Sequence, residues 1–167
     1  YIPTLTGSTV TRATETLNGS GNSTLINSTE GVLYAEIEAL VNGQATAKSI
    51  SLSDETNDNL IFIRLDTTAN RISSFARGGG GSYNILTVNG VNQTNNNKIA
   101  LVWDASNVRI WINGSQSLTQ SINNSPVGMK TLAFTSPTGS NTFYGKCKAL
   151  AVFNEALSDA ELTNLTS

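Results

Sequence analysis

Histidine is absent from this chain of 167 residues, and cysteine occurs only once. The lack of histidine excludes Ser-His-Asp and Cys-His catalysis, histidine general bases and most transition-metal sites. A single cysteine excludes an internal disulfide. Because Cys147 falls in a strand-like run, we expect it to be a small buried hydrophobic side chain, not a nucleophile.

Charged residues are also scarce, at 13% of the chain, and the net charge is −2. Without a basic run there is no electrostatic reason to expect nucleic acid as a partner. No apolar run is long enough to cross a bilayer, so membrane insertion is not expected. The length suits a single domain, which we take as residues 1–167.

Short polar side chains are abundant instead: the chain holds 20 Asn, 19 Ser and 21 Thr. These residues favour turns and β-structure over helix. Surfaces of this kind are frequent in extracellular and viral β-proteins.

Alternation of apolar and polar residues predicts about ten short strands separated by turns. The clearest hairpin joins Lys98–Asp104 to Val108–Asn113, and it places Trp103 on an apolar face that we assign to the core. The other predicted strands are 9–17, 33–39, 47–53, 60–66, 70–77, 83–88, 129–134 and 142–153.

The only helix signal lies near the carboxyl end of the chain. Ser158-Asp-Ala-Glu161 fits a capping box, in which the serine hydroxyl and the glutamate satisfy each other's backbone amides. It follows Cys147–Phe153, a strand whose two alternating faces are both nearly apolar, as expected of a strand covered on both sides. The sequence therefore predicts an all-β antiparallel sandwich with a short C-terminal helix.

Three segments carry a resemblance to a known family. The opening consists of Thr9–Arg12 followed by Glu30–Glu36, the hairpin Lys98–Gly114 ends in an aromatic-apolar-Asn-Gly pattern, and Phe143–Leu162 closes the chain with a strand and a capped helix. In this order they resemble the laminin-G-like jelly rolls of the concanavalin A-like lectin/glucanase fold, as found in phage tail proteins and bacterial adhesins. The resemblance implies two curved sheets, with a glycan bound on a concave face or its rim. It also implies other subunits of a fibre or tail as partners, and a location in a virion tail or fibre, or outside the cell or at its surface.

Glycan binding needs exposed aromatic rings that stack on sugar C–H faces, and amides or guanidinium groups that bond hydroxyls. Trp111 and Arg109 lie on the strand face opposite the apolar one, which makes them the leading pair. Tyr83 and Arg77 flank the four-glycine loop Gly78–Gly81, and Asn113 ends the hairpin, so these three join the candidates. The alternative for Trp111 is that it packs beneath the second sheet or a loop.

A catalytic alternative rests on Glu36 and Glu38, which alternate on one strand. Retaining glycosidases of this fold carry three such carboxylates, and the outer pair acts as nucleophile and acid. Here the third position is Leu40, so the family pattern is broken where its acid should be. We therefore predict no enzyme and interpret the pair as a solvated face.

Cofactors are not expected. The glycine loop lacks the helix and the lysine of a phosphate loop. Calcium at Asp54, Asp58 and Asp66 stays open as an alternative, although these residues lack the glycine and distal glutamate of an EF-hand.

The leading hypothesis is a non-catalytic domain that binds a cell-surface glycan and recognises a host receptor in a phage tail fibre or surface adhesin. The alternatives are a structural module of a virion or fibre without a ligand, and a glycoside hydrolase that uses Glu36 and Glu38.

Overall fold

The computed structural model describes residues 21–167, which form ten strands and one helix. The strands in the first half are β1 (Gly31–Ala39), β2 (Lys48–Ser53), β3 (Leu60–Leu65), β4 (Arg71–Arg77) and β5 (Asn84–Asn89). Those in the second half are β6 (Asn97–Trp103), β7 (Asn107–Ile112), β8 (Ser115–Ser121), β9 (Thr131–Ala133) and β10 (Gly145–Phe153), followed by α1 (Asp159–Thr166).

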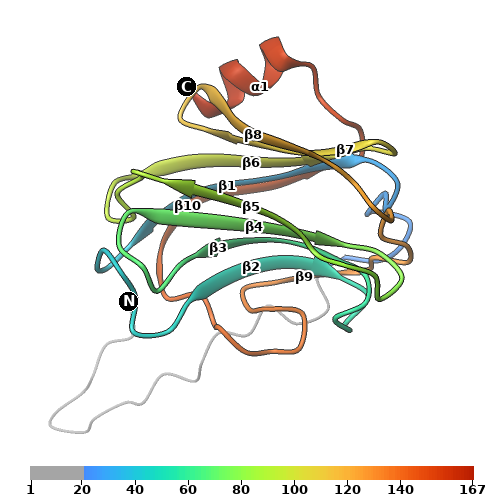
Figure 1. The fold of residues 1–167 in the computed structure, drawn as a ribbon, viewed down its shortest axis with the longest axis horizontal. Coiled ribbons are helices and arrows are strands. Elements are labelled where there is room, and N and C mark those ends of the chain that lie inside the picture. Colours follow the sequence, from blue (N-terminus) through green and yellow to red (C-terminus); the bar gives the residue numbers. More distant parts are fainter. Residues whose placement is uncertain (1–20) are drawn as a thin grey trace, which may run out of the picture.

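The strands form two five-stranded sheets. Sheet A has the order β5-β4-β3-β2-β9, and sheet B has the order β10-β1-β6-β7-β8. All neighbouring strands within each sheet pair antiparallel. Figure 1 shows the two sheets stacked as layers, with α1 beyond sheet B. The predicted all-β jelly-roll sandwich with a C-terminal helix is confirmed.

The main core lies between the two sheets and follows the predicted alternation. Leu33, Ala35, Ile37 and Ala39 of β1 face this core, and Trp103 is fully buried in it. Strands β2, β3, β4, β6 and β7 contribute a matching set of aliphatic side chains, because residues at alternate positions share a face.

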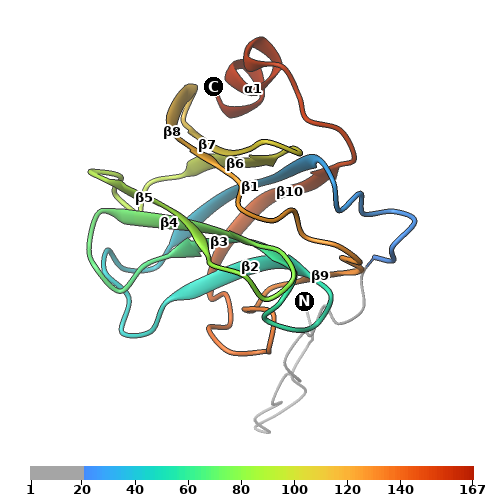
Figure 2. The ribbon, with the colours of Figure 1, turned by 45° about the vertical axis from the view of Figure 1, so that its right-hand side comes forward.

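Helix α1 covers the outer face of sheet B. The predicted capping box is present: the Ser158 hydroxyl accepts a bond from the Glu161 amide, and the Glu161 side chain accepts one from the Ser158 amide. Leu162 of α1 packs in a cluster with Val32, Tyr34 and Trp111. Figure 2 shows α1 over β7 and β8, on the side of the molecule away from sheet A.

Strand β8 was not predicted. Its sequence Ser-Gln-Ser-Leu-Thr-Gln-Ser is almost wholly polar, because it forms the edge of sheet B and has little apolar surface to bury. The turn before it was the available signal. Asn113 and Gly114 both adopt positive φ (50° and 84°), as a two-residue hairpin turn requires.

The prediction that Cys147 is buried was wrong. Its strand β10 is the other edge of sheet B, and even the second half of β10 is only partly buried. Cys147 is exposed between Lys146 and Lys148, which are exposed as well. The apolar residues on both faces of this strand therefore do not mean that both faces are buried.

The edges of the two sheets are joined by side chains where β5 lies beside β8. The Gln120 side-chain amide donates to the Ile85 carbonyl (2.9 Å), and the Asn84 side-chain amide donates to the Ser121 carbonyl (2.7 Å). Polar side chains thus connect the sandwich along this side.

The predicted strand at 9–17 lies outside the described residues. In residues 21–167, no helix has the length and apolar character needed to span a bilayer.

Candidate functional site

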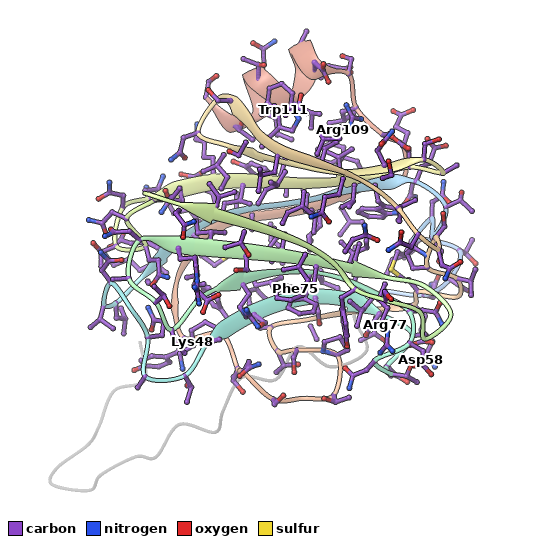
Figure 3. All side chains as sticks on the ribbon, viewed as in Figure 1. Lys48, Asp58, Phe75, Arg77, Arg109 and Trp111 are labelled. Atoms are coloured by element: carbon purple, nitrogen blue, oxygen red, sulfur yellow. The ribbon has the colours of Figure 1, made fainter. Side chains whose placement is uncertain are left out.

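The leading pair from the sequence lies beneath the helix. Trp111 is only 6% exposed, and its ring packs against Tyr34 and Leu162. Figure 3 shows Trp111 and Arg109 beside α1, on the opposite side of the sandwich from Phe75 and Arg77. The alternative for Trp111 was that it packs beneath the second sheet or a loop. Trp111 is indeed covered, but the element that covers it is α1.

Arg109 and Asn113 have structural partners. Arg109 forms an ion pair with Asp159 of α1 at 2.9 Å, which holds the helix on sheet B. The Asn113 side chain accepts a bond from the Lys98 amide (3.0 Å) and donates one to the Asn97 side chain (3.0 Å), so it fixes the hairpin end. Their positions give these residues no place in an open site, and a ligand-binding role for them stays an untested prediction.

A shallow depression of about 250 Å³ lies on the outer face of sheet A. Its floor comes from β3 and β4, and its rim comes from three loops. The lining residues are Asn57, Phe62, Arg64, Phe75, Tyr83, Ser136, Pro137, Thr138, Ser140 and Asn141.

Aromatic rings form the floor of this depression. Phe62 and Phe75 face each other across β3 and β4, with ring centres 4.4 Å apart and planes 11° apart. Tyr83 meets Phe75 edge-on at 6.2 Å and is 39% exposed. These rings are separate from the core between the sheets, because positions 62 and 75 point to the outer face.

One wall of the depression is the wall loop, which we define as residues 135–142. The Ser51 hydroxyl donates to the Thr135 carbonyl (2.8 Å), and the Ser49 amide donates to the Asn141 carbonyl (2.9 Å). Ser136 and Ser140 bond each other across the loop at 2.7 Å. The wall loop is therefore anchored on β2 and presents hydroxyl and amide groups beside the aromatic floor.

Arg77 and Tyr83, both predicted from the sequence, come together at the rim. The Arg77 guanidinium lies 4.6 Å from the centre of the Tyr83 ring. Arg77 donates through Nε to Gly81 O (2.6 Å), through Nη2 to Gly80 O (2.7 Å), and through Nη1 to Asn57 O (2.7 Å) and Tyr83 Oη (3.3 Å). Arg77 thus holds the glycine loop and Tyr83 in place, with each of its nitrogens already engaged. Gly79 and Gly80 both have positive φ, which suits glycine in this tight arrangement.

Arg64, like Phe62, Phe75 and the wall loop, lines the depression but was not among the residues predicted from the sequence. Its guanidinium lies 4.3 Å from the centre of the Phe75 ring, within the range of a cation–π contact. Its Nη2 donates to Asp66 at 3.1 Å. The available signal was its position: Arg64 is the one charged residue in the apolar strand β3, two residues from Phe62 and on the same face.

The carboxylates considered for catalysis lie on sheet B. Glu36 accepts a bond from the Asn96 side chain (2.6 Å) and has Lys148 at 3.7 Å, while Glu38 pairs with Lys146 at 2.7 Å. The Asn96 bond and the nearby lysines lower the pKa of Glu36. A general acid in a glycosidase needs a raised pKa, so this environment does not suit that role.

The acidic residues considered for calcium do not form a cluster. Asp54 bonds Thr56 and Asn59 in its own turn, and Asp66 bonds arginines at the other end of β3. Within residues 21–167, no group of three His, Cys, Asp or Glu side chains is placed to hold a metal ion.

Solved structures with the same fold include a carbohydrate-binding domain, a pentraxin and a part of a trans-sialidase. The CBM40 domain of Ruminococcus gnavus IT-sialidase, bound to α2,3-sialyllactose, is 18% identical with a TM-score of 0.71, and the match covers 90% of this chain and 94% of that one. A heptameric SAP-like pentraxin from Limulus polyphemus is 12% identical with a TM-score of 0.69, covering 91% of this chain and 75% of that one. The leech intramolecular trans-sialidase is 19% identical with a TM-score of 0.68, covering 89% of this chain but 26% of that one.

At these identities the likeness establishes the fold alone. No curated protein matches the sequence. A family model described as the concanavalin A-like lectin/glucanases superfamily, Laminin_G_3, matches residues 17–163. The chain therefore belongs to the Laminin_G_3 family of the concanavalin A-like lectin/glucanase superfamily.

Proposed function

We propose that this protein is a non-catalytic carbohydrate-binding module whose site is the depression on the outer face of sheet A. The observation that carries the proposal is the exposed Tyr83 ring, which rests on the buried Phe62–Phe75 stack beside a wall loop rich in hydroxyls and amides. An apolar sugar face packs on aromatic rings, and sugar hydroxyls bond side chains of the kind found in the wall loop. The R. gnavus domain bound to sialyllactose supports the proposal, because it has the same fold.

A glycan array with a paired tyrosine substitution tests this proposal. The wild-type protein, displayed at high density, should bind a defined set of glycans. Tyr83→Ala should lose that binding, whereas Tyr144→Ala should keep it, because Tyr144 is 69% exposed but does not line the depression. A wild-type protein that binds no glycan on the array would overturn the proposal and favour a structural module without a ligand. Unchanged binding by Tyr83→Ala would place the site elsewhere.

Absence of catalysis is part of the proposal. Glu36 and Glu38 are paired with lysines and lie on sheet B, away from the depression. We expect no hydrolysis of any glycan that the array identifies, measured by release of reducing sugar over a long incubation. Turnover by the wild type that disappears in the Glu36→Gln/Glu38→Gln double variant would establish the hydrolase instead.

We further propose that the module recognises a host receptor in a phage tail fibre or surface adhesin, and that it is exposed on the virion or the cell surface. The polar, weakly charged composition supports such a setting. A shallow site binds weakly by itself, and several copies on one fibre raise the overall avidity. Antibodies against this domain should label the surface of intact particles or producing cells. Labelling that appears only after lysis would contradict this location.

A further inference from the structure

The charge of the depression comes from one side chain. Arg64 is the single ionised residue among the lining residues, all of which lie in the described part of the chain. The lining contains no carboxylate that would repel an anion. A ligand with one negative group would therefore meet a positive charge directly beside the aromatic floor.

Arg64 also has hydrogen-bond donors to offer. A guanidinium carries five N–H groups, and Arg64 uses Nη2 to bond Asp66. Its Nη1 bonds no residue in the range 21–167, and its Nε is buried without a hydrogen-bond partner there. The side chain is 28% exposed, and Nη1 is the nitrogen that can donate to a ligand.

Arg77 differs from Arg64 in this respect. Each of its three guanidinium nitrogens already bonds the glycine loop, Asn57 or Tyr83. It is a positioning residue for the rim, so the two arginines near the depression have different tasks.

Asp66 holds Arg64 in position from behind. Its side chain is 5% exposed and accepts bonds from Arg64, from Arg71 at 2.9 Å and from the Ser73 hydroxyl at 2.9 Å. Two arginines share one carboxylate, which leaves one positive charge in excess. Because the Asp66 contact directs the guanidinium across Phe75, little side-chain freedom remains to be lost when a ligand binds.

From these contacts, and resting on the proposed function, we propose that the glycan bound here carries a carboxylate, that Arg64 receives it, and that Asp66 is the positioning residue for Arg64. The planar guanidinium edge matches a carboxylate, and such charge-assisted bonds are stronger than bonds to neutral hydroxyls. The sugar ring then lies against the exposed ring of Tyr83. Both sialic acids and uronic acids offer this chemistry.

Isothermal titration with four ligands tests the assignment: α2,3-sialyllactose, a glucuronic-acid oligosaccharide, lactose and sulfated lactose. At least one carboxylated ligand should bind about tenfold or more tighter than lactose, and the tighter of the two identifies the acidic sugar. In Arg64→Gln this preference should vanish while the affinity for lactose stays the same. Lys146→Gln removes an equal charge on sheet B and should change neither the affinity for lactose nor the preference for carboxylated ligands.

Asp66→Asn should weaken the preference without removing affinity for lactose, which a purely structural role would not produce. If that variant does not fold, Ser73→Ala, which removes one Asp66 bond, should give a smaller loss of preference. Equal wild-type affinity for carboxylated and neutral sugars would overturn the inference, as would a preference that survives Arg64→Gln or tighter binding of sulfated lactose.

The outcomes separate this inference from the proposed function. Binding of neutral sugars that depends on Tyr83, without a preference for acidic ones, would leave the carbohydrate-binding function standing and remove only the carboxylate assignment. Binding of no sugar at all would remove both.

Discussion

Phe62 and Phe75 stack across β3 and β4 with their ring centres 4.4 Å apart, on the face of sheet A that points away from the core. Most large side chains of a sandwich face inward, between its sheets. Here two phenylalanines are buried on the outer side instead, under Arg64, Tyr83 and the wall loop. This stack is the physical basis of the site, because it forms a buried apolar base on which Arg64 and Tyr83 rest, with polar groups around them.

The first prediction concerns the floor itself. Phe75→Ala should lower the free energy of unfolding by about 3 kcal/mol, because it removes a buried ring and the stacking of that ring on Phe62. It should also abolish glycan binding. Phe75→Leu should cost less stability, yet it should still weaken binding, because it removes the ring on which Arg64 and Tyr83 rest. Urea denaturation and titration calorimetry measure the two effects; normal glycan affinity in a folded Phe75→Leu protein would argue against the aromatic floor.

The second prediction separates sheet B from the site. Trp111→Ala should destabilise the protein by about 3–5 kcal/mol, because the indole packs beneath α1. Trp111→Phe should retain most of the packing and bind glycans as the wild type does. If Trp111→Phe lost glycan binding at an unchanged melting temperature, the site would have to be sought on sheet B.

The third prediction distinguishes Arg77 from Arg64. Arg77→Met should weaken binding of acidic and neutral sugars by the same factor, because it releases Tyr83 and the glycine loop from their anchor. We expect a loss of about 1–3 kcal/mol in stability from the unsatisfied carbonyls. Affinities measured with lactose and with a carboxylated sugar check this. A selective loss for the acidic sugar would instead give Arg77 the role that we assign to Arg64.

The fourth prediction is a pH dependence that arises from Asp66. Burial alone would raise the pKa of Asp66, but bonds from Arg71 and Ser73 and the charge of Arg64 outweigh it and hold the pKa well below its usual range. Since the folded-state pKa is depressed, the stability that this group contributes is complete above the unfolded-state pKa of about 3.9. It is lost as the pH falls from there through the folded-state value.

Denaturant titrations below pH 5 check this expectation. The wild type should lose stability steeply over this range, whereas Asp66→Asn should start lower and fall less, because it has no carboxylate to protonate at this position. Parallel curves for the two proteins would show that Asp66 does not contribute through its charge.

Much of the architecture could be predicted because local patterns agree with the fold. The alternation in β1, the hairpin of β6 and β7, and the capping box at Ser158 each report a local physical requirement: a buried face, a tight turn, a satisfied amide. Strand β8 was not predicted, because an edge strand can be polar on both faces and then shows no alternation. The extent of the domain, 1–167, stays a prediction, with the family model matching 17–163.

The site was harder to predict because it depends on which faces are covered. The sequence shows that Trp111 lies opposite the apolar face of β7, but not that α1 returns to cover it. Likewise, Phe62 and Phe75 look like core residues until the register of β3 and β4 places them together on the outer face. Tyr83 and Arg77 were found because the glycine loop marks a rim. Arg64 has no such marker in the sequence, apart from being the one charged residue of an apolar strand.

The side-chain amides that connect β5 and β8 have a consequence for the behaviour of the protein at high concentration. Gln120 and Asn84 occupy the carbonyls of Ile85 and Ser121, which would otherwise be free to pair with a neighbouring chain. Exposed edges with free carbonyls are templates for aggregation. Crowded copies of this domain would thus find fewer open acceptors on one another along this side, which disfavours edge-to-edge association between them.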